Sequence, residues 1–238
     1  VLKIMTGSRS LVLAVLVLCV SFKTTKVQAS VADIGGVSEV SGYAQIKRTG
    51  LTSASLNYDA NLDFLVKTND EAITTNGRMA ITFLDDSVVK LTEHSQLTVD
   101  KYIYDPDPSK AKMALTFGLG TARFISGKLG KMDRKNISLK TPTADIAIRG
   151  TDFTATVDEL GRSLIILLPD KYGMSSGEIE VLTATGAVTL NKPYEATTVS
   201  VFESNPSKPV ILDLSLEFID NMLIVTSPAK KKIIEVER

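Results

Sequence analysis

The sequence is poor in the residues that most often carry catalysis or bind metals. It has no tryptophan, one cysteine and one histidine in 238 residues. Cys19 lies in an apolar N-terminal run that we expect to be removed, which would leave no disulfide, thiolate metal site or cysteine nucleophile. His94 stands alone in a polar stretch, so it completes neither a zinc site nor a serine–histidine–aspartate set. We therefore predict no catalytic residue, no metal site, no cofactor and no enzymatic activity.

Charge of one sign is not in excess either. The 27 basic residues balance the 27 acidic ones, but four of the basic ones occur within residues 1–29, where no acidic residue stands. The remainder then has 23 basic and 27 acidic residues, a net charge of −4. A mildly acidic chain has no global electrostatic attraction for nucleic acid, so we expect no nucleic-acid partner.

Residues 1–29 have the order of segments found in a secretory signal peptide. A short polar and basic stretch precedes the apolar run Leu11–Val20, and Val27-Gln28-Ala29 has the small-residue spacing of a cleavage site before Ser30. The run is shorter than the roughly 20 apolar residues of a spanning helix. We predict export to the periplasm or outer envelope of a Gram-negative bacterium, without a spanning helix in the mature chain. An uncleaved signal that anchors the protein is the alternative.

From about Val37 to Pro209 the hydrophobic pattern has the period of two that is typical of β-strands. Short apolar alternations are separated by Gly, Asn, Asp and Pro, and no helical stripe is sustained over three turns. This predicts an all-β fold, an antiparallel sandwich or β-roll of short strands with little helix outside the signal peptide. Residues 30–210 would form this domain, and two lobes at 36–160 and 161–210 are left open. Residues 211–238 would add a strand or a helix and a basic tail.

One change of register is informative. Ala144, Ile146 and Ile148 share even parity, whereas Phe153 and Ala155 share odd parity. A one-residue slip in a continuous strand is what a β-bulge produces, and Gly150 offers the backbone freedom for it. We therefore predict a bulge at Gly150, with backbone angles outside the β region.

Several short segments in a fixed order resemble the FecR family. A threonine–proline pair, an apolar strand and the turn Arg149-Gly150-Thr151-Asp152-Phe153 are similar to the family's signature. Three further segments agree with it, although Asp86 stands where the family usually has glycine. Together these segments span most of residues 36–210; the three are Thr74–Ser87, Gly120–Gly127 and Gly177–Val181.

The resemblance implies a β-rich extracytoplasmic module. The best-known family members relay a signal from an outer-membrane receptor to a cytoplasmic sigma factor. That role also needs a cytoplasmic regulatory segment before a membrane helix, and this chain has at most ten residues before its apolar run. The resemblance therefore predicts a stand-alone domain without the anti-sigma segment, and an outer-membrane receptor is one partner that it suggests.

Two features are candidate binding sites. The stretch 123–140 has a local net charge of +5, which suits an anionic envelope polymer or an acidic protein surface; the simpler interpretation is that these charges protect strand edges from aggregation. Arg149 is the second candidate, and its simpler role is to belong to a structural corner in which Thr151 and Asp152 bond backbone groups. The binding candidates are Arg123, Lys128, Lys131, Arg134, Lys135 and Arg149; the corner comprises Arg149, Gly150, Thr151, Asp152 and Phe153.

These observations predict a non-catalytic binding or signalling module that recognises a protein or polymer of the cell envelope. The first alternative is a structural subunit of a surface assembly or homo-oligomer, because an exposed strand edge can accept a partner strand. A carbohydrate-active enzyme that uses two carboxylates is the second alternative. No pattern in the sequence indicates which two carboxylates would face each other in such a site.

Overall fold

The computed structural model describes residues 32–50, 54–133, 136–215, 217 and 219. The chain divides into two compact units, Val1–Ser30 and Val31–Arg238, and all described residues belong to the second. The predicted signal peptide at 1–29, two of the binding candidates, Arg134 and Lys135, and the basic tail lie outside the described residues.

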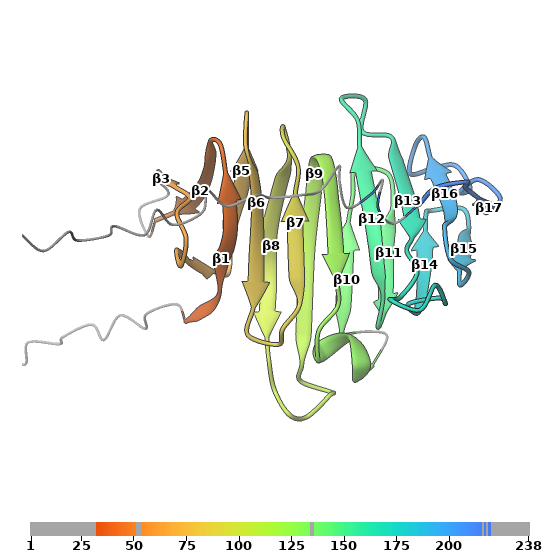
Figure 1. Cartoon of the computed structure of the whole chain (residues 1–238), viewed down its shortest axis with the longest axis horizontal. Coiled ribbons are helices and arrows are strands. Elements are labelled where there is room, and N and C mark those ends of the chain that lie inside the picture. Colours follow the sequence, from red (N-terminus) through yellow and green to blue (C-terminus); the bar gives the residue numbers. More distant parts are fainter. Residues whose placement is uncertain (1–31, 51–53, 134–135, 216, 218, 220–238) are drawn as a thin grey trace, which may run out of the picture. The chain divides into compact units, whose positions relative to one another are not determined.

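The described residues form two β-sheets that share one strand (Figure 1). The first sheet contains, in spatial order, β4 (Leu65–Lys67), β1 (Asp33–Ser41), β6 (Arg78–Phe83), β7 (Val88–Leu91), β9 (Lys112–Ile125), β12 (Asp152–Val157), β13 (Ser163–Leu167), β16 (Glu195–Val199) and β17 (Val210–Ile211). The second contains β3 (Ser55–Asp59), β2 (Ala44–Thr49), β5 (Asp70–Thr74), β8 (Gln96–Ile103), β9, β10 (Ile137–Lys140), β11 (Asp145–Arg149), β14 (Glu178–Leu182) and β15 (Ala187–Leu190).

The strands follow each other along both sheets in nearly the order of the sequence. Figure 1 shows this as a colour change from β1 at one end to β16 and β17 at the other. Every pairing between described strands is antiparallel except that of β9 with β10. The predicted all-β class is confirmed: apart from the short 3-10 turn η1 (Leu129–Lys131), only residues 217 and 219 of the described part are helical. No helix in the described part has the length and apolar composition needed to cross a membrane.

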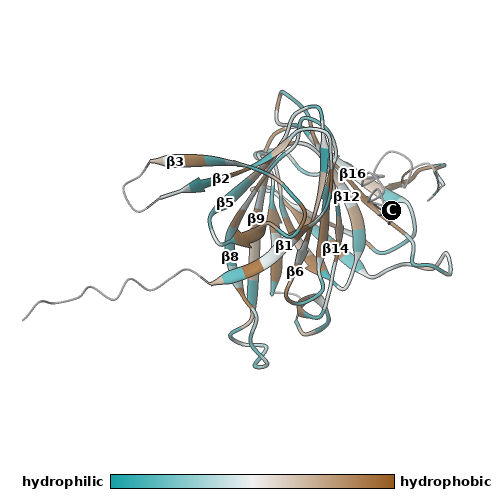
Figure 2. Ribbon diagram, turned by 60° about the vertical axis from the view of Figure 1, so that its left-hand side comes forward, coloured by the Kyte–Doolittle hydropathy of each residue, from teal (hydrophilic) through white to brown (hydrophobic). Residues whose placement is uncertain are grey.

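Alternating side chains from both sheets build the main core. The ribbon in Figure 2 shows hydrophobic and hydrophilic residues following each other along the strands. On β6, for example, Met79, Ile81 and Phe83 are buried, as the period of two predicts. The core runs without a break through the β12–β13 hairpin, from Ile34 to Val199.

A second, smaller apolar cluster lies on the other face of β13. Here Ile166 and Leu168 pack with Ala196 and Ile219. The backbone N–H of Ile219 donates to the carbonyl of Ser215 at 3.2 Å, a helical contact that follows residues 212–214, which belong to no helix or strand. Because β13 faces apolar groups on both sides, its residues 164–167 are continuously apolar rather than alternating.

The register change at Gly150 has a different cause from the one that we predicted. The φ angle of Gly150 is +56°, outside the β region as expected. The strand is not continuous, however, because β11 pairs within the second sheet and β12 pairs within the first. The parity changes because the chain crosses between sheets at a corner, so the prediction of a bulge in one strand was wrong.

Candidate functional site

The corner between β11 and β12 is exposed to solvent at one end and buried in the core at the other. Arg149, the last residue of β11, is exposed, whereas Phe153 on β12 is fully buried. The Phe153 ring packs against that of Phe124 on β9, with 5.6 Å between the ring centroids. Burial of this aromatic side chain anchors the corner, and Arg149 is presented at its outer side.

The hydrogen bonds of the corner come from groups that the sequence did not indicate. The hydroxyl of Ser176 accepts from the backbone N–H of Asp152 at 3.0 Å, and the carbonyl of Thr151 accepts from the N–H of Ser126 at 2.9 Å. The Thr151 hydroxyl, which we expected to bond the backbone, is buried without a hydrogen-bond partner within the described part of the chain. The carboxylate of Asp152 pairs with a side chain instead.

That side chain is Arg123, one of the predicted binding residues. Its Nε donates to Oδ1 of Asp152 at 2.8 Å and its Nη2 to Oδ2 at 2.6 Å. The side chains are only 12% and 17% exposed. A bidentate ion pair this deeply buried holds β9 against β12. Arg123 therefore stabilises the fold and is not part of an exposed surface.

Lys128, another predicted binding residue, lies on the surface beside a carboxylate. Its Nζ is 2.8 Å from Oδ2 of Asp86, and both side chains are well exposed. This hydrogen bond raises the pKa of Lys128 above its ordinary value. Much of its charge is therefore compensated by Asp86, the residue that stands where the family usually has glycine.

The 3-10 turn after Lys128 is held by a buried carboxylate. Asp85, which is fully buried, accepts at Oδ2 from the N–H of Leu129 (3.1 Å) and at its carbonyl from the N–H of Lys128 (2.7 Å). Its Oδ1 accepts from the hydroxyl of Tyr102 at 3.1 Å. Burial is the main reason that the pKa of Tyr102 is raised well above its usual value. These contacts tie η1 to the β6–β7 turn and fix where Lys131 stands.

Lys131 and Arg149 meet at a groove, which we call the corner groove. It has a volume of about 410 Å³ and is open to solvent. The structure thus brings together two of the predicted binding residues from separate segments, and leaves Arg123 and Lys128 in ion pairs. The described lining residues are Gly130, Lys131, Met132, Asp133 and Arg149.

A second groove of about 350 Å³, the hairpin groove, lies on the other side of Asp133, which lines both. Its cations come from the β8–β9 hairpin and were missed from the sequence. The signal was present, because a hairpin with its turn at the Asp105–Ser109 loop places the end of β8 beside the start of β9, with Ile103 opposite Lys112. The described lining residues are Lys101, Pro108, Ser109, Lys110, Ala111, Lys112, Asp133 and Asn136.

Acidic residues border the corner groove along the second sheet. Arg149 lies opposite Glu178 in the β11–β14 ladder, and Ala147 lies opposite Glu180. The second sheet therefore places negative charge directly beside Arg149.

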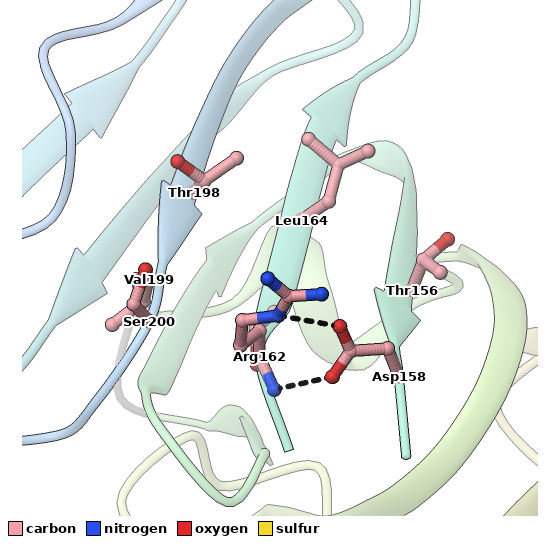
Figure 3. A pocket seen from close by; sticks show the side chains of 8 residues that line it. Thr156, Asp158, Arg162, Leu164, Thr198, Val199 and Ser200 are labelled. Carbon is pink, nitrogen blue, oxygen red and sulfur yellow. Dashed lines mark hydrogen bonds and ion pairs between the residues drawn. The ribbon is translucent and has the colours of Figure 1, made fainter. Parts of the chain in front are cut away.

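A third cavity, of about 330 Å³, lies beside the β12–β13 hairpin (Figure 3). Its ion pair is local: Nε of Arg162 donates to Oδ2 of Asp158 at 2.6 Å, and the N–H of Arg162 donates to Oδ1 at 2.9 Å. Slight burial acts to raise the pKa of Asp158, but the bonds from Arg162 outweigh it and the pKa is lowered. Both charged groups thus stabilise their own turn, which makes this cavity a weaker candidate than the corner groove.

Comparison with known proteins identifies the domain that carries the corner. Residues 69–169 match the sequence profile of the family described as FecR protein. This is narrower than the span suggested by the resemblance, and it includes β5 to β13 with both the Asp85 turn and the Arg149 corner. No protein of curated function matches the chain.

Among solved structures, two crystal structures of a candidate anti-sigma factor from Parabacteroides distasonis, at 1.65 and 2.50 Å resolution, are similar to the chain. Each is 16% identical, with a TM-score of 0.42. Each alignment covers 57% of this chain and 56% of the other, so the chain spans little more than half the length of that protein. The family match places the Asp85 turn, η1 and the Arg149 corner within one module, and the chain therefore carries a FecR domain at residues 69–169.

Proposed function

We propose that the protein is a non-catalytic signalling module of the bacterial envelope, which binds a protein or polymer partner at the corner groove. The observation that carries this proposal is the meeting of Lys131 and Arg149, both within residues 69–169, at one open groove. Both cations are exposed, whereas Arg123 and Lys128 are each held in an ion pair with a carboxylate. An anionic group on a partner can therefore pair with both.

The groove is supported by a rigid frame, as a recognition site requires. The Asp85 hydrogen bonds hold η1, which ends at Lys131, and the Phe153–Phe124 contact holds the corner that carries Arg149. A site whose supporting residues are already ordered loses less entropy when its partner binds.

The chemistry of the grooves suits binding rather than catalysis. Asp133 is the single carboxylate among the described residues that line the two grooves, so they offer no pair of facing carboxylates for glycoside hydrolysis. His94 lies exposed in the turn between β7 and β8 and lines neither groove.

One observation favours assembly as a second function. The terminal strands β3 and β17 expose apolar side chains, Leu56 at 53% and Ile211 at 63%. Open edges with exposed apolar groups, one in each sheet, can pair head to tail between copies of a chain. Molecular mass that rises with concentration in sedimentation would support this function.

The proposed function is tested by capture from the envelope fraction of the native host with the tagged full-length protein as bait. Lys131→Gln/Arg149→Gln removes the two groove cations, and Lys192→Gln/Lys208→Gln removes two exposed charges elsewhere as a matched control. We expect a component that is captured by the wild type and the control and lost with the groove variant. Equal capture by the groove variant, or capture of the bait protein alone, would overturn the proposal.

A further inference from the structure

The two grooves at this end of the sandwich adjoin each other. Asp133 lines both, with the η1 side of the corner groove on one flank and the β8–β9 hairpin on the other. A ligand that fills both must therefore be extended, because one small anion would occupy a single groove only.

The combined lining carries a clear excess of positive charge. Its described residues include five cations against the one carboxylate, Asp133. Lys110 also has Asp107 nearby, at 3.3 Å between Nζ and Oδ2, but these two side chains are 68% and 44% exposed, so solvent weakens the pair. The five cations are Lys101, Lys110, Lys112, Lys131 and Arg149.

The hairpin groove also contains an unused polar group. Asn136 lines it and is 5% exposed, and its Nδ2 has no hydrogen-bond partner within the described residues. Buried donors are nearly always paired in native proteins. An acceptor that enters the groove can reach this donor after a small movement of the lining, which would satisfy it.

We propose that the two grooves form one continuous site for an acidic polysaccharide, whose successive carboxylates lie against the hairpin lysines and then against Lys131 and Arg149. The proposal rests on the proposed function in taking the corner groove as the binding site. It adds the hairpin groove as a second subsite and a carboxylate-bearing sugar chain as the ligand.

The lining favours a sugar chain over an acidic peptide. Tight peptide and protein interfaces are anchored by aromatic or large apolar side chains in pockets, and the apolar residues described here are only Pro108, Ala111 and Met132. Clustered lysines with neighbouring hydroxyl and amide groups suit repeated anionic groups on a hydrophilic chain, as in heparin-type patches.

The test is calorimetric titration of the full-length protein with long oligogalacturonate, with galacturonate monomer, with poly-L-glutamate and with a neutral oligosaccharide. We expect oligogalacturonate to bind about 100-fold more tightly than the monomer, because the second subsite binds at a high effective concentration once the first is filled. Poly-L-glutamate should bind more weakly than oligogalacturonate, and the neutral sugar should not bind.

Variants separate the two subsites. Lys101→Gln/Lys110→Gln and Lys131→Gln/Arg149→Gln should each weaken oligogalacturonate binding by about 10-fold, and Lys192→Gln/Lys208→Gln should change it less than 2-fold. Circular dichroism and the urea midpoint establish that each variant is folded. Unchanged affinity in the hairpin variant, tighter binding of poly-L-glutamate, or equal affinity for monomer and oligomer would overturn the inference. Loss of an envelope component with the groove variant while oligogalacturonate fails to bind would leave the proposed function standing and remove only this inference.

Discussion

Two of the places where the chain crosses from the second sheet to the first look alike in sequence and differ in structure. At Gly120, in the middle of β9, the strand leaves β8 and β10 and joins β7 and β12 without interruption. At Gly150 the chain breaks the ladder and turns a corner between β11 and β12. Both glycines have positive φ angles, +94° and +56°. In both places the buried positions change parity.

The difference lies in what surrounds each glycine. A Cβ on Gly120 would lie 2.6 Å from the Cα of buried Ser95, whereas a Cβ on Gly150 would meet only the carbonyl of Gly130 at 3.5 Å. The crossing inside β9 is closed by packing, and the corner opens onto η1 and the corner groove. A sheet crossing can thus either bury the backbone or leave it open, and of these two crossings only the one at Gly150 opens onto the proposed binding groove.

The largest effect is expected for Gly120→Ala. The methyl group meets the Ser95 backbone, and overpacking costs roughly 1–3 kcal/mol, with about 1–2 kcal/mol more for an L-residue at positive φ. We expect the free energy of unfolding to fall by about 3 kcal/mol in urea denaturation. A loss below about 1 kcal/mol would show that β9 relaxes freely at this crossing.

Asp85→Asn tests the frame beneath the corner groove. The amide can accept at one position only, so donors from Ser87, Leu129 or Tyr102 lose a partner in a buried site. We expect a loss of about 2–3 kcal/mol in stability and faster hydrogen exchange at the N–H of Leu129 than at strand amides of β9. Exchange that is accelerated equally throughout would contradict a local role for Asp85.

Asp152→Asn tests whether Arg123 belongs to the fold. Asparagine can accept only one of the two hydrogen bonds from Arg123, and the largely buried guanidinium loses its counter-charge. The free energy of unfolding should fall by about 1–2 kcal/mol. A double-mutant cycle with Arg123→Gln gives the coupling between the two side chains. Additive effects would show that the pair contributes nothing, and would return Arg123 to the candidates for binding.

Gly150→Ala should cost less than Gly120→Ala, because only the backbone angle opposes it. We expect a loss of about 1 kcal/mol, and a smaller loss for Gly150→Asn, since asparagine tolerates the left-handed region. Equal losses at Gly150 and Gly120 in the same urea assay would show that the two crossings do not differ in packing.

The smallest effect is expected on the stability at alkaline pH, and it comes from Tyr102, which contacts Asp85 beneath the corner groove. The raised pKa of Tyr102 means that its phenol stays protonated in the folded protein above pH of about 10, where the unfolded chain ionises. Its contribution to stability is therefore complete below that pH and is lost as the pH rises further. Tyrosinate absorbance should show one late-titrating tyrosine that disappears in Tyr102→Phe. If the variant removes an ordinary tyrosine from the curve, the Asp85–Tyr102 contact is not formed.

The two crossings also show which features of the fold could be predicted from the sequence and which could not. The parity change at Gly150 was visible and correctly required backbone angles outside the β region, but a bulge and a sheet crossing give the same pattern along the chain. The parity change in β9, from Leu115 and Phe117 to Ala122 and Phe124, was visible as well. Whether such a strand stays continuous depends on its neighbours, which the local pattern does not contain.

The sequence alone determined the all-β class, the inward faces of most strands and the FecR-like segments, because side-chain alternation and turn residues act over a few positions. Only the tertiary structure decided which cations are available. It pairs Arg123 with Asp152 and Lys128 with Asp86, and it brings Lys131 beside Arg149. The physical reason is that an ion pair depends on distance in space, which is set by strand pairing between segments remote in the chain.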